Sequence, residues 1–338
     1  MGADTREILF DFSPFSATGG AIDAGAAHDA RPSIQILLAA PRGFCAGVRR
    51  AIDAVRDALA LHGAPVYVRR PIVHNVAVMR ELEAEGAIFV QELSEIPEGA
   101  VAVLSAHGVA PAVAGEAARR GLVYYDAVCP LVAKVHREVE RHHKDGRHVV
   151  LVGHEGHPEI EGTLGHLPEG AATLVRTAND VAALGLDGAA PTAFAVQTTY
   201  SVEEAAEVVT ALQGRFADLA APPSSDICYA TTNRQAAVRA IAARADAMIV
   251  AGESFSSNAS RLAEVASARC ASVQLVAEAA DLDWSRLPAS GAIGITAAAS
   301  TPERSVDGIL AALAERYDLR VEEVEAASET IVFKRVAV

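Results

Sequence analysis

Three of the four cysteines of this 338-residue chain share one sequence context, and they are the first candidates for chemistry. Cys45, Cys129 and Cys228 each stand directly before a stretch that predicts a helix. The positive end of a helix dipole favours the thiolate, the form of cysteine that binds metals and attacks electrophiles. We therefore expect these three thiols to act together, whereas Cys270 has no counterpart at the equivalent offset and is assigned to packing.

Polar residues follow the three cysteines at matched intervals, and each of them stands just after an apolar, strand-like run. The first interval joins Cys45 to His74 over 29 residues, Cys129 to His157 over 28, and Cys228 to Ser256 over 28. The second interval ends at His107, Thr198 and Ser300, which lie 62, 69 and 72 residues after the respective cysteines. The repeat period is the spacing between successive cysteines of this set, and it exceeds the roughly 20–50 residues of solenoid repeats. It therefore indicates three copies of a small α/β unit around one centre.

Alternation of strand and helix patterns predicts an α/β protein with mostly parallel sheets. Ligands of such sheets bind beyond the carboxyl ends of the strands, and all the polar candidates stand at such ends. The first unit is expected over 33–129, with 33–46 packing on the third unit. The second and third units are expected over 130–226 and 227–338, and residues 1–32 form an N-terminal extension without helical or strand periodicity.

Two details of the local structure are also predicted from sequence signals. Thr232 and Gln235 have the spacing of a capping box, in which each residue satisfies a free backbone N–H at a helix start. The stretch Thr330–Arg335 near the end of the chain is expected to form the last strand.

Composition narrows the class of protein and its partners. Hydrophobic residues make up 51% and charged residues 21% of the chain, which is typical of a well-packed globular protein. The net charge of −14, without a basic cluster, argues against nucleic acid as a partner. No apolar run reaches the roughly 18 residues needed to span a membrane. With four cysteines and no signal peptide, we expect a reducing compartment and a cytoplasmic protein.

Three thiolates without a matching fourth limit the kinds of metal centre. They can hold an iron–sulfur cluster with one iron left open, or a zinc ion with an open position. Soft sulfur ligands suit both metals. The paired C-x2-C motifs typical of structural zinc are absent, which disfavours a closed zinc site.

The polar endpoints predict an anion-binding site around the cysteines, because backbone N–H groups at helix N-termini bind phosphate. The candidates are His74, His107, His157, Thr198, Ser256, Ser257, Asn258 and Ser300. Simple helix capping is the better interpretation, taken singly, of Ser256, Ser257, Asn258 and Thr301, and a structural role explains His74 or His107 equally well. Neither the G-x-G-x-x-G nor the Walker motif occurs, which argues against a nucleotide.

Glu159 is the candidate proton donor. It lies in the loop Gly153–Gly162, beside Pro158 and close to two histidines. Burial next to a metal-bound substrate would raise the pKa of its carboxyl group and keep a proton available. A solvated loop glutamate is the alternative interpretation, and it fits Glu155 and Glu161 better than Glu159 only through the resemblance described next.

Nine ordered motifs between about residue 33 and residue 320 resemble the LytB family of 4-hydroxy-3-methylbut-2-enyl diphosphate reductases. The motifs are Arg42–Val48, Val73–Asn75, Ser105–Val109, Asp126–Pro130, Gly153–Glu159, Gln197–Thr199, Cys228–Arg234, Ser256–Asn258 and Ala299–Pro302. The long N-terminal extension departs from the family pattern but removes no motif residue.

The resemblance implies a trefoil of three α/β units around a 4Fe-4S cluster held by Cys45, Cys129 and Cys228. It also implies that the substrate hydroxyl binds the fourth iron. His157 and Thr198 would lie close to the reacting end of the allylic diphosphate substrate. Its diphosphate would be held by the other residues of the predicted anion site, which are His74, His107, Ser256, Ser257, Asn258 and Ser300.

The resemblance further implies the reaction, the reductive dehydroxylation that ends the non-mevalonate (MEP) isoprenoid pathway. Glu159 would pass a proton through Thr198, with His157 nearby, so that two electrons and two protons expel water. The products would be isopentenyl diphosphate and dimethylallyl diphosphate. Since no flavin or nicotinamide fingerprint occurs, an external donor of the ferredoxin or flavodoxin type would supply the electrons.

Two alternatives remain open at this stage. A dehydratase or isomerase would use the open iron only as a Lewis acid and would need no reductant. A binding or sensor protein would use the cluster for regulation, and the proposed anion-binding residues would then be helix caps.

Overall fold

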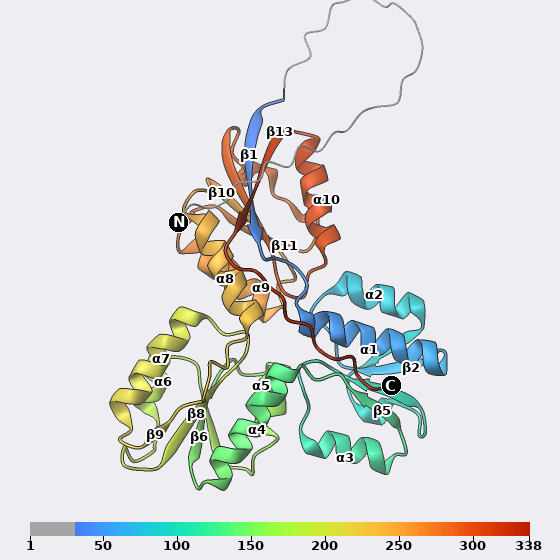
Figure 1. Cartoon of the computed structure of the whole chain (residues 1–338), viewed down its shortest axis with the longest axis vertical. Helices are drawn as coiled ribbons and strands as arrows, with labels where there is room; N and C mark the ends of the chain where they lie inside the picture. Colours follow the sequence, from blue (N-terminus) through green and yellow to red (C-terminus); the bar gives the residue numbers. More distant parts are fainter. Residues whose placement is uncertain (1–30) are drawn as a thin grey trace, which may run out of the picture.

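The computed structural model describes residues 31–338, which form three sheets covered by helices and arranged as three lobes (Figure 1). All strand pairs within residues 31–338 are parallel, as the alternating pattern predicts. The α/β class and the trefoil arrangement are therefore confirmed. All but residues 31 and 32 of the expected N-terminal extension lie outside the described residues.

The first sheet has the strand order β3-β2-β4-β5. Its strands are β2 (Val66–Arg69), β3 (Ala87–Val90), β4 (Val101–Leu104) and β5 (Val123–Asp126). The helices of this lobe are α1 (Ala46–His62), α2 (Val76–Glu85) and α3 (Pro111–Arg119), with a 3-10 turn η1 (Leu93–Glu95).

The second sheet repeats this order as β7-β6-β8-β9. Its strands are β6 (His148–Val152), β7 (Ala172–Val175), β8 (Thr192–Val196) and β9 (Leu219–Ala220). The helices of this lobe are α4 (Pro130–Lys144), α5 (Pro158–Leu164), α6 (Ala178–Ala183) and α7 (Val202–Arg215).

The third sheet has the order β11-β10-β12-β1-β13, so the first strand of the described chain lies between two of the last ones. Its strands are β1 (Ser33–Ala40), β10 (Ala247–Ala251), β11 (Val273–Val276), β12 (Gly291–Ala297) and β13 (Asp318–Glu325). The helices of this lobe are α8 (Tyr229–Ala242), α9 (Ser257–Ser267) and α10 (Glu303–Ala314), with 3-10 turns η2 (Ala279–Asp281) and η3 (Trp284–Arg286).

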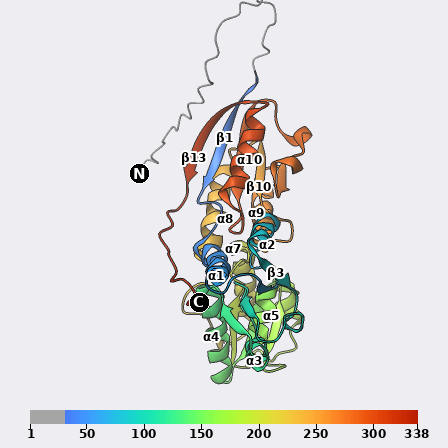
Figure 2. The same ribbon diagram turned by 90° about the vertical axis from the view of Figure 1, so that its right-hand side faces the viewer.

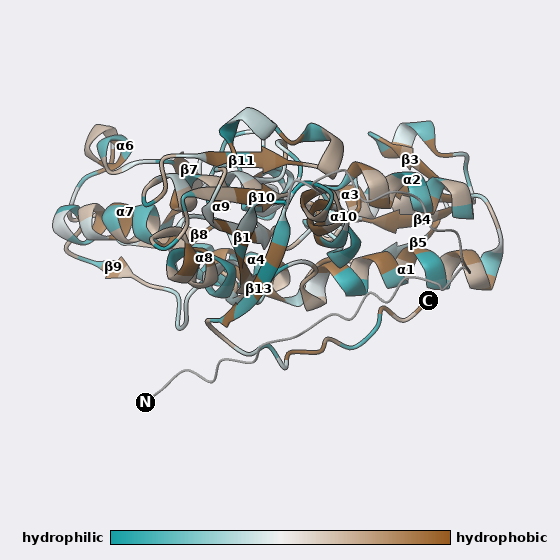
Figure 3. Ribbon diagram, turned by 90° about the horizontal axis from the view of Figure 1, so that it is seen from above, coloured by the Kyte–Doolittle hydropathy of each residue, from teal (hydrophilic) through white to brown (hydrophobic). Residues whose placement is uncertain are grey.

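Burial explains why these segments form parallel strands. Every residue of β8 and β10 is buried, as is expected for strands covered by helices on both faces. Figure 3 shows the contrast between largely hydrophobic central strands and helices with hydrophilic residues on their outer sides. β13 differs because exposed and half-buried residues alternate along it, as on the edge of a sheet.

The chain passes from one sheet to the next at each of the three cysteines. After β1 of the third sheet, α1 packs on β2 and β4 of the first sheet. After β5, α4 packs on β6 and β8 of the second sheet, and after β9, α8 packs on β1 and β12 of the third. The three crossings therefore close a cycle, and the cysteines stand where the lobes meet.

The predictions of a last strand near the end of the chain and of a capping box at Thr232 and Gln235 are both wrong. Thr330–Arg335 forms no strand, because the place beside β1 is taken by β13 and the chain leaves the sheet after Glu325. The tail instead runs across to α1, as Figures 1 and 2 show, where Arg335 pairs with Asp57 at 2.8 Å. The capping box at Thr232 does not form, since α8 already begins at Tyr229 and Thr232 lies inside it.

No helix within residues 31–338 combines the length and the apolar character that crossing a membrane requires.

The position of β1 leads to a test of the fold. Ile36 is fully buried between β12 and β13, so Ile36→Ala should lower the free energy of unfolding by about 2–5 kcal/mol. Leu61 in α1 is 59% exposed, and Leu61→Ala should change it by less than about 0.5 kcal/mol. Denaturant unfolding measures both, and equal effects would contradict the placement of β1.

Candidate active site

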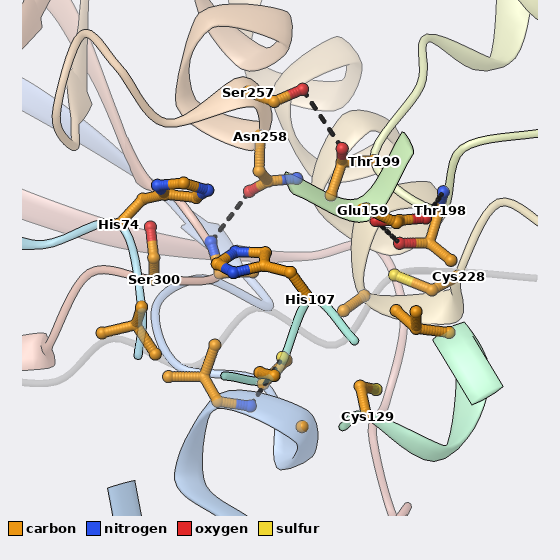
Figure 4. Close-up of a pocket in the computed structure, with 18 of the residues that line it drawn as sticks. His74, His107, Cys129, Glu159, Thr198, Thr199, Cys228, Ser257, Asn258 and Ser300 are labelled. Carbon is orange, nitrogen blue, oxygen red and sulfur yellow. Dashed lines mark hydrogen bonds between the residues drawn. The ribbon is translucent and has the colours of Figure 1, made fainter. Parts of the chain in front are cut away.

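A single cavity lies where the three lobes meet, with an empty volume of about 720 Å³. Figure 4 shows Cys129 and Cys228 together at the lower right of this cavity, while His74 and Ser257 lie at the upper left. All the site residues expected from the sequence line it. They are Cys45, Cys129, Cys228, His74, His107, His157, Glu159, Thr198, Ser256, Ser257, Asn258 and Ser300.

Each of the three cysteines is the N-cap residue of a helix, as the sequence context predicts. The sulfur of Cys45 accepts a hydrogen bond from the N–H of Val48 at 3.4 Å, and the sulfur of Cys228 accepts one from Thr231 at 3.4 Å. Cys129 is followed by Pro130, which suits the first helical position because its missing N–H is not needed there. All four cysteines of the chain are free thiols.

The backbone N–H of each cysteine makes an equivalent bond in each lobe. It donates to a carbonyl oxygen in the loop after the neighbouring strand of the same sheet. The three bonds run from Cys45 to Ala299 at 3.2 Å, from Cys129 to Ala106 at 3.0 Å, and from Cys228 to Thr198 at 3.0 Å. Each acceptor is, or directly precedes, a predicted substrate-binding residue, so the same bond places a thiol and a polar side chain side by side.

The space between the sulfurs is kept open by Gly47. A Cβ atom at this position would lie 2.9 Å from the sulfur of Cys129 and 3.7 Å from that of Cys45. The two sulfurs therefore face the same small volume, which any side chain larger than hydrogen would enter. Within residues 31–338 no three His, Cys, Asp or Glu side chains are grouped as ligands of a single metal ion. In a polynuclear cluster each thiolate binds a different metal atom, so the three free sulfurs fit such a group.

The charge state of the thiols differs from the expectation based on the helix dipole. Burial raises the pKa of Cys129 to about 12 and that of Cys228 to about 11, and the neighbouring cysteines raise both further. Hydrogen bonds from backbone N–H groups act in the opposite direction but are outweighed. Cys129 and Cys228 therefore remain protonated unless a cationic group enters between them.

The polar residues come from the points where each sheet reverses its strand order. In the first sheet, the chain leaves β2 toward β3 and leaves β4 toward the opposite side, and their loops carry His74 and His107. The pairs β6 and β8, and β10 and β12, are arranged in the same way. Such switch points are the usual ligand sites of parallel sheets.

Three histidines form a cluster at the cavity wall. The ring centre of His74 lies 4.4 Å from that of His107 and 5.7 Å from that of His157. Burial lowers the pKa of His74 to about 4 and that of His157 to about 3, and it holds the pKa of His107 well below its ordinary value. Both ring nitrogens of His74 and Nδ1 of His107 are buried without a hydrogen-bond partner in the described chain.

Hydroxyl and amide groups complete the wall opposite the cysteines. Ser256 caps α9 through the N–H of Ala259 at 3.4 Å, and its hydroxyl lies 3.2 Å from that of Ser300. The side-chain oxygen of Asn258 accepts a bond from the N–H of Ala299 at 2.8 Å (Figure 4). Ser256 is thus both a helix cap and a cavity residue. Among the described residues that line the cavity there is no lysine or arginine.

Glu159 is the carboxylic acid of the cavity, and only 2% of it is exposed. The N–H of Thr198 donates to its Oε1 at 2.6 Å, and the hydroxyl of Thr198 donates to its Oε2 at 2.8 Å. Its own N–H donates to Nδ1 of His157, the N-cap residue of α5, at 3.1 Å. Burial raises the pKa of Glu159 to about 7, against the effect of the two bonds from Thr198.

Two cavity residues were missed in the sequence. The hydroxyl of Thr199 lies 3.1 Å from that of Ser257, and the hydroxyl of Thr231 lies 3.3 Å from the sulfur of Cys228. The spacing of Thr231, three residues after a helix-capping cysteine, is a signal that could have identified it, because the N–H at this position bonds the cap. Thr199 carries no such signal beyond standing next to Thr198.

Comparison with known proteins gives a consistent family. The family model described as "LytB protein" matches residues 36–314. The 4-hydroxy-3-methylbut-2-enyl diphosphate reductase of Paracoccus denitrificans is 53% identical over 307 residues, covering 90% of this chain and 97% of the relative. The protein of that name from Methylocella silvestris is 51% identical over 305 residues, covering 90% and 96%.

Two solved structures are similar to the whole fold. The E-1-hydroxy-2-methyl-but-2-enyl-4-diphosphate reductase from Plasmodium falciparum matches with a TM-score of 0.85 and 37% identity, covering 90% of this chain and 96% of that one. A structure of (E)-4-hydroxy-3-methyl-but-2-enyl diphosphate reductase, described as the terminal enzyme of the non-mevalonate pathway, matches with a TM-score of 0.60 and 30% identity, covering 83% and 99%.

The raised pKa of Glu159 predicts a pH-dependent stability. Between pH 4.5 and about 7 the unfolded chain loses this proton while the folded chain keeps it. The free energy of unfolding therefore falls over this window, by on the order of 3 kcal/mol, and Glu159→Gln should abolish that part of the fall. Denaturant unfolding at pH 5 and pH 8 tests this, with Glu155→Gln as the exposed control in the same loop. A Glu159→Gln protein that follows the parent at both pH values would contradict it.

Proposed function

The chain belongs to the LytB protein family, and from this we propose that it reduces (E)-4-hydroxy-3-methylbut-2-enyl diphosphate to isopentenyl and dimethylallyl diphosphate, the last step of the non-mevalonate route. The observation that carries the proposal is one cavity in which three free thiols face a buried carboxylic acid and a set of anion-binding groups. Those elements together match a reduction that removes a hydroxyl group from an allylic diphosphate.

The cofactor in this proposal is a 4Fe-4S cluster held by Cys45, Cys129 and Cys228. Support comes from three free sulfurs without a fourth, and from Gly47, whose missing side chain leaves the space between two of them open. When bound, a cluster with one iron not held by protein supplies electrons one at a time and a Lewis-acidic corner. The side chain of Thr231 lies against the sulfur of Cys228 and would orient that ligand.

The substrate diphosphate would be held by neutral donors rather than by fixed positive charges. The hydroxyls of Ser256, Ser257 and Ser300, the amide of Asn258 and the unpartnered nitrogens of His74 and His107 line the same cavity. The N-terminus of α9, an 11-residue helix, adds backbone N–H groups and its dipole. An anion entering here would favour protonation of the histidines, whose pKa values are low in its absence.

Glu159 is the proton source for the departing hydroxyl. Its pKa of about 7 leaves a large protonated fraction at neutral pH, which suits a general acid. The hydroxyl of Thr198 stands in contact with the carboxyl group and can relay the proton toward the cavity. With two electrons and two protons taken up, the hydroxyl leaves as water. His157 contacts the backbone of Glu159 and fixes the start of α5.

The electron donor would be a separate protein of the ferredoxin or flavodoxin type, because the sequence contains no dinucleotide-binding glycine motif. We also propose a cytoplasmic location. The four free cysteines are compatible with the reducing conditions there.

Turnover with a chemical reductant tests the function. Anaerobically prepared protein with dithionite-reduced methyl viologen should convert the substrate to both products, and Glu159→Gln should lower kcat by about 100-fold or more. Glu155→Gln should remain at the parental rate. Turnover without reductant would instead indicate a dehydratase, and parental kcat in Glu159→Gln would refute the proton role.

The space at Gly47 tests the cofactor. Gly47→Ala places a methyl group 2.9 Å from the sulfur of Cys129, so iron and sulfide per chain should fall by about half or more, as for other disturbed metal sites. Gly308 is also inside a helix but has open space around it, and Gly308→Ala should keep the full content. Elemental analysis of anaerobic preparations measures this. Full iron content in Gly47→Ala would count against the cluster position.

A further inference from the structure

A cation occurs early in each helix that a cysteine caps. Arg50 stands five residues after Cys45 in α1, and Lys134 stands five residues after Cys129 in α4. The third cation is Arg234 in α8. It stands six residues after Cys228. None of these three side chains lines the cavity.

Each cation contacts the main chain just before another of the three cysteines, in the cyclic order Cys45, Cys129, Cys228 and back to Cys45. Nη1 of Arg50 donates to the carbonyl oxygens of Ala127 and Val128, at 3.2 and 2.9 Å. These are the two residues that precede Cys129. The helix capped by Cys45 thereby holds the loop of the second cysteine.

The same relation recurs in the second lobe. Nζ of Lys134 donates to the carbonyl oxygens of Ser224 and Ser225, at 2.9 and 3.1 Å, and to Oδ1 of Asp226 at 3.1 Å. Asp226 is fully buried, and its other oxygen accepts a bond from Val196 at the end of β8. The helix capped by Cys129 thus holds the loop of Cys228.

Arg234 closes the cycle, and only 1% of its side chain is exposed. Its Nε and Nη2 donate to the carbonyl oxygen of Gly43, two residues before Cys45, at 3.0 and 2.7 Å. Its Nη1 also donates to Glu329 in the C-terminal tail at 2.9 Å. The tail reaches Arg50 as well, where the carbonyl oxygen of Lys334 accepts a bond at 2.9 Å, on the path visible in Figures 1 and 2.

We propose that Arg50, Lys134 and Arg234 form a cation ring that positions the three cysteine loops for the cluster. This inference rests on the proposed cluster. Each contact joins the helix capped by one cysteine to the loop that carries another, so the ring links all three cysteine loops. Charge-assisted bonds to carbonyl oxygens are stronger than neutral ones. The three cations make these bonds without lining the cavity proposed for the substrate.

The three cations differ in whether a carboxylate lies close enough to pair with their charge. Lys134 pairs with Asp226, and Arg234 pairs with Glu329. Arg50 has no carboxylate within ion-pair distance in residues 31–338, and its partners are carbonyl oxygens alone. No ion pair is lost when Arg50 is replaced, only its bonds to the cysteine loop and the tail, which makes Arg50 the most informative position to change. Since a lysine performs this role at residue 134, a lysine at residue 50 should also serve.

The lifetime of the cluster under a chelator provides the test. Anaerobic protein is mixed with excess EDTA, and the loss of visible absorbance and of bound iron is followed. Arg50→Met should lose its cluster about tenfold faster than the parent, the effect typical of residues that orient metal ligands. Arg50→Lys should recover most of the parental lifetime. Arg56→Met removes a charge from the exposed side of the same helix and should match the parent.

The outcomes separate a positioning role from a structural one. Thermal melting of the cluster-free proteins shows whether each variant folds. If Arg50→Met does not fold, Lys134→Met and Arg50→Gln replace it in the test. Parental lifetimes in the folded variants would overturn the cation ring, as would an Arg50→Lys protein no better than Arg50→Met. A parent protein without iron or sulfide would refute the proposed cluster instead, so the two failures remain distinct.

Discussion

Three backbone hydrogen bonds at the meeting point of the lobes determine the geometry of everything around them. The N–H of each cysteine donates to the loop that follows the neighbouring strand, at Ala299, Ala106 and Thr198. These bonds lie beyond the ends of the paired strands β1 and β12, β4 and β5, and β8 and β9. A thiol and a substrate-facing residue are thus placed by the same bond in each lobe, so neither can shift without moving the other.

The cavity combines a polar wall with an absence of fixed charge among the described residues that line it. Burial lowers the pKa values of His74 and His157, which are neutral before a ligand binds, and it raises that of Glu159, which keeps a large protonated fraction. Burying charged side chains without partners would cost far more free energy than burying hydroxyl and amide groups that bond one another. The cations lie behind the cysteine loops, where carbonyl oxygens satisfy them. The site therefore gains its charge only when ligand and cofactor are present.

Local signals in the sequence predicted the parts of this site that depend on local structure. The N-cap positions of the cysteines follow from short-range patterns, and the matched intervals reflect the repeated strand order of the sheets. Thr330–Arg335 has the pattern of a strand, but the position next to β1 was already filled by β13. The capping signal at Thr232 was overridden because Cys228 caps the helix one turn earlier. The ring of Arg50, Lys134 and Arg234 could not be predicted, since its partners are far away in the sequence.

The thiols show why a local rule fails in a shared centre. A helix N-terminus stabilises one thiolate, and the bonds from Val48 and Thr231 to the sulfurs act in that sense. Burial and the neighbouring sulfurs, however, raise the pKa values of Cys129 and Cys228 and outweigh these bonds. The dipole effect is limited to the first turn of each helix, while desolvation acts on the whole buried thiol. The fold therefore holds these two ligands in place but keeps them protonated, and a cationic group that enters must displace their protons as it binds.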